Sequence, residues 1–154
     1  MKQRIYIDTS VIGGYYDEEF QEATRELFKR LENNEIIFVV SDLLELELIE
    51  APEQVRQLIE KYSADKFERV ALTADANQLA NAYITEKVVG KTSLEDCRHI
   101  ALATIKKVDV LASWNFKHIV NLDRIKGYNS VNLRLGYPMI EIRSPKDLIK
   151  YGND

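Results

Sequence analysis

The sequence has few of the residues that build disulfide-stabilised or zinc-binding proteins. Its 154 residues include one cysteine, two histidines, three prolines and six glycines. The single cysteine, Cys97, cannot form an internal disulfide. The N-terminal region also lacks an apolar segment long enough for a signal peptide or a membrane span. We therefore expect a cytoplasmic protein with no membrane partner.

The chain also lacks repeats, low-complexity tracts and linkers. Its length and its 45% hydrophobic content suit one compact core, and general scaling predicts that folding buries about two-thirds of the unfolded surface. We therefore predict a single domain over residues 1–154.

The net charge of −4 at first argues against a nucleic-acid partner, because phosphate contacts favour basic surfaces. The charge is distributed unevenly, however. Residues 1–116 carry 14 Lys or Arg against 21 Asp or Glu, whereas residues 117–150 carry seven cations against three anions. Scattered surface charge is one explanation of this difference, and a basic segment that binds RNA is the other.

Apolar runs of strand length alternate with patterns typical of helices. The runs predict strands at residues 5–7, 35–40, 67–72, 108–113 and 139–142. Helical spacing predicts helices at residues 17–33, 41–51, 52–63, 73–87, 93–107 and 119–135, with a C-terminal turn at 144–149. Gly127 weakens the helix at 119–135 by about 1 kcal/mol relative to alanine. This alternation favours an α/β fold, a three-layer sandwich with a mostly parallel sheet.

The first candidate site residue is Asp8, which ends the first strand-like run. Open parallel sheets bind ligands at the carboxyl ends of their strands, so Asp8 is placed for function. The alternative is that Asp8 caps a helix or turn, and that Thr9 and Ser10 only satisfy that turn rather than adding hydroxyl ligands. Gly13 and Gly14 do not match a phosphate-binding loop, which requires a lysine after a longer glycine spacing.

Two further acids are predicted near the same edge. Glu47 lies in the helix after the second strand, where Leu46 and Leu48 suggest a largely buried helix, although most helical glutamates are solvated. Asp96 stands third in a helix after Ser93, a spacing that a capping box alone would explain. His99 follows one turn later, and a lone histidine more often packs or hydrogen-bonds than binds a ligand.

The segment at 113–119 follows a strand and therefore falls at the same edge. Asn115 can offer a carbonyl oxygen to a hard cation, and Ser113 can support it. Trp114 and Phe116 are interpreted as core or lid residues rather than as platforms for base stacking. Lys117 and His118 could face a phosphate or could simply be solvated, so both alternatives stay open.

Grouped carboxylates favour a particular chemistry. Several carboxylates brought together repel one another unless cations neutralise them, and an all-oxygen set suits Mg²⁺ or Mn²⁺ rather than Zn²⁺. Such ions activate water and orient a phosphodiester for in-line attack. Hydrolysis of a nucleic-acid strand is therefore the leading hypothesis.

At this point the chain resembles the PIN-domain ribonucleases, and in particular the virulence-associated (VapC-like) toxins of type II toxin–antitoxin systems. The resemblance covers nearly the whole chain and rests on four motifs in order: "IYIDTSVIGG", "VSDLLELEL", "EDCRHIALA" and "LASWNFKHI". It implies a sheet of about five parallel strands and a metal-dependent endoribonuclease with Asp8, Glu47 and Asp96 as metal ligands. It also implies a homodimer that is silenced by a small antitoxin protein.

One departure from the family pattern is Asn115, where many members have aspartate. Three carboxylates leave the second of two divalent ions weakly held, so we expect one ion in the resting protein. The departure also leaves a second hypothesis open, a catalytically degenerate PIN fold that binds RNA or protein. A phosphatase of the haloacid-dehalogenase type fits less well, because it expects an aspartate where this chain has Ser10.

Overall fold

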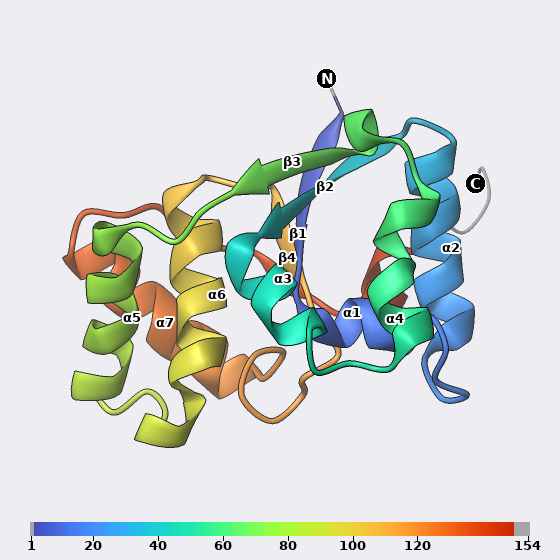
Figure 1. Ribbon diagram of the computed structural model, residues 1–154. Helices are drawn as coiled ribbons and strands as arrows, with labels where there is room; N and C mark the ends of the chain where they lie inside the picture. The colour runs from blue at the N-terminus through green and yellow to red at the C-terminus, as the bar shows by residue number, and fades with distance from the viewer. Residues whose placement is uncertain (1, 150–154) are drawn as a thin grey trace.

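A computed structural model describes residues 2–149 and contains one sheet of five strands (Figure 1). The strands are β1 (Gln3–Ile7), β2 (Ile36–Ser41), β3 (Phe67–Val70), β4 (Val110–Ala112) and β5 (Ile142–Arg143). Their spatial order is β3-β2-β1-β4-β5, and every neighbouring pair is parallel. The predicted α/β class with about five parallel strands is therefore confirmed.

The strand order reverses at the centre of the sheet. From β1 the chain builds outward through β2 and β3, and it then returns to place β4 on the other side of β1. Ile7 at the end of β1 pairs with Ala112 at the end of β4. Ligands of open α/β sheets bind in the crevice outside the carboxyl ends at such a reversal point. The residues that follow Ile7 and Ala112 therefore leave the sheet side by side where a ligand is expected.

Helices cover both faces of the sheet. One group comprises α1 (Thr9–Gly14), α2 (Gln21–Glu32) and α4 (Glu53–Gln57), and the other comprises α5 (Ala74–Thr85), α6 (Leu94–Ile105) and α7 (Leu122–Arg134). The helix α3 (Asp42–Leu48) follows β2 and contributes leucines to the cores on both faces. This is the predicted three-layer sandwich.

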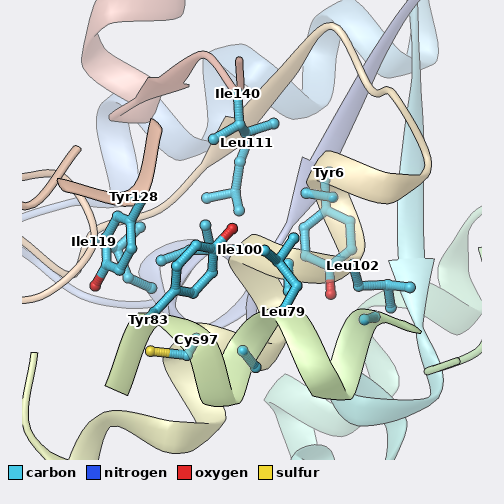
Figure 2. Close-up of a cluster of buried hydrophobic side chains, with 14 of the residues drawn as sticks. Tyr6, Leu79, Tyr83, Cys97, Ile100, Leu102, Leu111, Ile119, Tyr128 and Ile140 are labelled. Carbon is cyan, nitrogen blue, oxygen red and sulfur yellow. The ribbon is translucent and has the colours of Figure 1, made fainter. Parts of the chain in front are cut away.

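The alternation of side chains along the strands explains the two cores. On β2, Val39 joins the core under α5, α6 and α7, whereas Phe38 and Val40 join the core under α1, α2 and α4. Figure 2 shows part of the first core, where Tyr6 of β1 and Leu111 of β4 lie near side chains of α5 and α6. Strand β2, at the position predicted for the strand at 35–40, is therefore covered on both faces.

Several predicted boundaries are wrong. The helix predicted at 17–33 begins at Gln21, and α1, which was not predicted, precedes it. The helix predicted at 52–63 divides into α4 and a 3-10 turn at Ile59–Lys61. The strand predicted at 139–142 pairs with β4 only at Ile142–Arg143. The helix predicted to start at 119 starts later, because the side chain of Asn121 caps α7 by accepting from the backbone N–H of Arg124.

The structure also tests the predicted helix caps. Ser93 precedes α6 but its side chain makes no capping hydrogen bond, so the capping box predicted with Asp96 is wrong. At the C-terminal turn, Ser144 and Asp147 do form a capping box, with Pro145 in the first turn. Further 3-10 turns lie at Ala64–Lys66, Lys91–Ser93 and Pro145–Leu148. In the described part of the chain, no helix has the length and apolar character that crossing a membrane requires.

Candidate active site

Asp8 lies at the end of β1, at the reversal point of the sheet, and its carboxylate is buried. It caps α1, as the structural alternative predicted, because its Oδ1 accepts from the backbone N–H of Val11 at 3.3 Å. The same oxygen accepts from Ser10 Oγ at 2.5 Å, and Oδ2 accepts from Ser113 Oγ at 2.6 Å. The cap fixes the carboxylate in place and does not exclude a second role for it.

The Ser113–Asp8 hydrogen bond joins the segment after β4 to the segment after β1. Ser113 Oγ also accepts from the backbone N–H of Asn115 at 3.0 Å, and Ser10 Oγ accepts from the backbone N–H of Trp114 at 2.8 Å. Two serine hydroxyls thus hold both segments against each other. These hydrogen bonds are structural, and a role of Ser10 or Ser113 in binding an ion stays a prediction.

Asp96 reaches this junction from the first turn of α6. Its Oδ2 accepts from Asn115 Nδ2 at 3.3 Å, and the side chain is half-buried. The side-chain oxygen of Asn115, Oδ1, accepts from the backbone N–H groups of Lys117 and His118 at 3.2 and 3.0 Å. The amide therefore offers its donor to Asp96 and uses its oxygen to close the loop.

Glu47 projects from α3 toward α6. Its Oε1 lies 2.5 Å from His99 Nε2, and His99 Nδ1 lies 2.7 Å from the hydroxyl of Tyr6. The Tyr6 hydroxyl donates in turn to Ser41 Oγ at 3.0 Å. The chain Ser41–Tyr6–His99 is buried, whereas Glu47 at its end is partly exposed. Leu46 is 64% exposed, so the expectation of a helix buried around Glu47 is wrong on that side.

The pKa values of the three acids are shifted in different directions. Burial raises the pKa of Asp8, and burial together with the charge of Asp8 raises the pKa of Asp96. Burial alone would raise the pKa of Glu47, but the hydrogen bond and the charge of His99 hold it below its usual range. Burial would lower the pKa of His99, but the hydrogen bond and charge of Glu47, with Asp8 and Asp96, raise it.

The donor set fits a hard divalent cation by its chemistry. Asp8, Glu47 and Asp96 supply carboxylate oxygens, which Mg²⁺ and Mn²⁺ prefer. In the loop of Asn115, the buried Nδ1 of His118 has no hydrogen-bond partner within residues 2–149. In the same residues, no three His, Cys, Asp or Glu side chains stand close enough to hold an ion together. Binding an ion would therefore require the carboxylates to move closer together than they stand in this structure.

Tyr6 and Ser41 were missed as residues of this region. Tyr6 was interpreted only as an apolar member of the first strand. A tyrosine between two isoleucines in a buried strand still needs a partner for its hydroxyl, and that requirement was the available indication. Its partners, Ser41 and His99, lie 35 and 93 residues away, so their identity depends on the tertiary fold.

Comparison with known proteins rests on structure. No protein-family model matches the sequence, and no curated protein matches it. The structure is similar to VapBC2 of Rickettsia felis bound to a promoter DNA fragment, at 14% identity and a TM-score of 0.58, covering 92% of this chain and 98% of that chain. It is also similar to DNA-bound VapBC of Salmonella typhimurium, at 18% identity and a TM-score of 0.58, covering 94% and 99%.

A third similar structure is VapC20 of Mycobacterium tuberculosis, a toxin that cleaves the sarcin–ricin loop. It shares 12% identity and has a TM-score of 0.56, covering 88% of this chain and 98% of that chain. At such identities the likeness concerns the fold. The chain therefore has the PIN fold seen in VapC toxins, which confirms at the level of the fold the resemblance drawn from the four sequence motifs.

Proposed function

We propose that the protein is a metal-dependent endoribonuclease that hydrolyses RNA phosphodiester bonds as the toxin of a toxin–antitoxin pair. The observation that carries the proposal is that two acids, Asp8 and Asp96, are both hydrogen-bonded to the segment that leaves the sheet at its reversal point. Asp8 accepts a hydrogen bond there from Ser113 in the segment after β4, and Asp96 accepts one from Asn115 in the same segment. The charges of Asp8 and Glu47 both raise the pKa of Asp96. The PIN fold shared with VapC20, a toxin that cleaves the sarcin–ricin loop, supports it.

The proposed metal ligands are Asp8, Glu47 and Asp96, and the proposed ion is Mg²⁺ or Mn²⁺. When bound, such an ion activates water and stabilises the leaving oxygen of a phosphodiester. The protein's own part is to hold the carboxylates: Ser10 and Ser113 fix Asp8, Asn115 fixes Asp96, and His99 fixes Glu47.

The proposed partners are RNA, a small antitoxin protein and a second copy of the chain. For RNA, the basic segment provides support. Within the described residues, Arg134 and Arg143 pair with glutamates, whereas Lys117 and Arg124 make no ion pair. Lys150, the last cation of that segment, lies outside the described residues. For an antitoxin, the support is that the similar Rickettsia and Salmonella structures are VapBC complexes.

Substitution of the acids tests this proposal. Asp8→Asn, Glu47→Gln and Asp96→Asn should each leave a folded protein that has lost RNA cleavage by at least a hundredfold, because each removes a negatively charged ligand from the ion. Calorimetry should find one Mn²⁺ in the wild type and none in Asp8→Asn or Asp96→Asn. Cleavage is measured on labelled RNA with Mg²⁺ and with Mn²⁺.

The matched control is Glu50→Gln, which removes an exposed carboxylate next to α3. It should keep both activity and ion binding. Full cleavage by Asp8→Asn or Asp96→Asn would show that the site is assigned wrongly. A wild type that binds RNA but cleaves none with either ion would favour the alternative, a degenerate PIN fold that serves as a binding module.

A further inference from the structure

A pocket of about 420 Å³ lies beside the candidate active site, and three aromatic side chains belong to its lining. We call it the aromatic pocket, and its lining residues are Glu19, Phe20, Glu22, Ala23, Trp114, Phe116, Lys146 and Ile149. Trp114 and Phe116 flank Asn115 in the sequence, and Asn115 is bonded to Asp96. The pocket and the acids of the site therefore share one loop, the segment after β4.

The rings of this pocket form a rigid base with one free face. Phe20 and Trp114 stack with their centroids 4.3 Å apart and their planes at 20°. Trp114 is fixed at both ends, because its Nε1 donates to Thr24 Oγ1 at 2.9 Å and its backbone N–H donates to Ser10 Oγ. Phe116 contacts both rings, with centroids 6.0 Å from Trp114 and 6.4 Å from Phe20.

Exposure distinguishes the two aromatic residues of the loop. Both were interpreted as core or lid residues; Trp114 is 8% exposed and belongs to the core, as predicted, whereas Phe116 is 50% exposed and is not a core residue. Burying the exposed half of this ring would be favourable in water. Phe116 is thus an aromatic surface that the fold supports but does not cover.

The charged side chains of the pocket are available to a ligand. Among residues 2–149, the side chains of Glu19, Glu22 and Lys146 make no hydrogen bond or ion pair. Apolar walls with a few free polar groups are typical of small-molecule sites, and about 420 Å³ lies within their usual range of volumes. Two carboxylates would repel a phosphate, but they can accept from the amino groups of a base. Lys146 can face the phosphate that flanks it.

We propose that the aromatic pocket binds one nucleobase of the RNA next to the phosphodiester that is cleaved, with Phe116 as the stacking surface. This proposal rests on the proposed function for the nature of the ligand. A base is favoured over an apolar side chain of a partner protein because free carboxylates and a free ammonium group line the same pocket. The loop that carries Phe116 also carries Asn115, so a strand bound at the acids passes this ring.

Binding of single-stranded RNA to Asp8→Asn protein, which is not expected to cleave, tests the proposal. The probe is an RNA octamer with 2-aminopurine at successive positions, whose fluorescence falls when that base stacks. Phe116→Ala should weaken binding between fivefold and a hundredfold and should remove the quenching at one position, since stacking on an aromatic residue contributes affinity of this size. Phe116→Trp should restore both.

The decisive comparison uses the same octamer without the base at the quenched position. Phe116→Ala should change the affinity for this abasic strand by less than twofold. The control substitution is Met139→Ala, which removes another exposed apolar side chain before β5, at the other end of the strands, and should change nothing. Circular dichroism verifies that each variant is folded.

Equal losses for the intact and abasic strands would overturn the proposal, and so would no loss for either, which is the result expected if the pocket binds a protein side chain. These failures differ from failure of the proposed function. If the wild type cleaves RNA but Phe116→Ala binds normally, only the base site is wrong. If the base-dependent loss is found but the wild type cleaves nothing, only the nuclease is wrong.

Discussion

The residue with the most unusual surroundings is His99, which is buried between a tyrosine and a glutamate. The Tyr6 hydroxyl donates to Ser41, so its oxygen accepts from His99 Nδ1, and Glu47 can only accept from Nε2. We therefore predict that both ring nitrogens donate and that the imidazole carries a positive charge in the folded protein. A cation at this position offsets part of the repulsion among Asp8, Glu47 and Asp96.

This charge state predicts how stability depends on pH. The pKa of His99 is raised, so its contribution to the free energy of unfolding is fully present below the unfolded pKa of about 6.5 and is lost as the pH rises through the folded pKa. The pKa of Glu47 is lowered, so its contribution is present above about pH 4.3 and is lost as the pH falls through its folded value.

The measurement is urea denaturation of the wild type and His99→Gln from pH 5 to pH 10, with chelator present. The difference in free energy of unfolding should be largest near pH 5 to 6.5 and should shrink at higher pH. Tyr6→Phe serves as the control, because it removes a hydrogen bond of the same network without removing a charge. A difference that stays constant with pH would show that His99 is neutral in the folded protein.

At the scale of elements, the short helix α1 connects the site to the core below it. Its last residue, Gly14, lies against Trp114 and Thr24, and a Cβ added there would lie 2.6 Å from Trp114 Nε1 and 2.9 Å from Thr24 Oγ1. A Cβ on Gly13, one residue earlier, would meet nothing within 4 Å. The structure therefore has no room for a side chain at Gly14, whereas it has room for one at Gly13.

Alanine at these positions gives a matched pair of variants. Gly14→Ala should destabilise the protein by about 1–3 kcal/mol, because it forces Trp114 away from Thr24. Gly13→Ala should stabilise it by roughly 0.5–1 kcal/mol, because alanine loses less backbone entropy in a helix. Thermal or urea unfolding measures both, and equal effects of the two substitutions would show that α1 does not pack closely on Trp114.

The same elements show what the sequence could predict. The strand at 35–40 and the cap at Ser41 follow from local patterns, because apolar β-branched runs and serine caps act within a few residues. Helix α1 could not be predicted from its six residues, two of which are glycines, because packing against Trp114 about a hundred positions later supports it. Close packing also explains the glycine at position 127 inside a helix, since a Cβ there would lie 2.7 Å from Val88 Cγ1.

The candidate site divides along the same line. Asp8 could be placed because the end of a strand is a local property, and so could Ser113 and Asn115 after β4. The hydrogen bonds from Ser113 to Asp8 and from His99 to Glu47 join residues 105 and 52 positions apart, so only the fold could reveal them. The loop geometry of Asn115 was equally hidden, because its oxygen closes a turn that the residue types do not specify.

At the scale of the whole molecule, a protein with net charge −4 must bind a polyanion through part of its surface only. Lys117 lies two residues after Asn115 and is exposed, and Arg124 stands in the first turn of α7, where it donates to the backbone oxygen of Val88. Both are close in sequence to the loop of the candidate site. These two cations are the best candidates for contacts with RNA phosphates.

Salt dependence tests this assignment. Lys117→Gln combined with Arg124→Gln should weaken RNA binding more at low salt than at high salt. The slope of log affinity against log salt should fall by about 1.4, since each contact with a single strand contributes about 0.7. Lys2→Gln with Lys106→Gln removes the same charge at the amino ends of β1 and β4 and should leave the slope almost unchanged. If both pairs lower it equally, RNA responds only to the net charge of the protein, and the basic segment does not guide the strand to the acids.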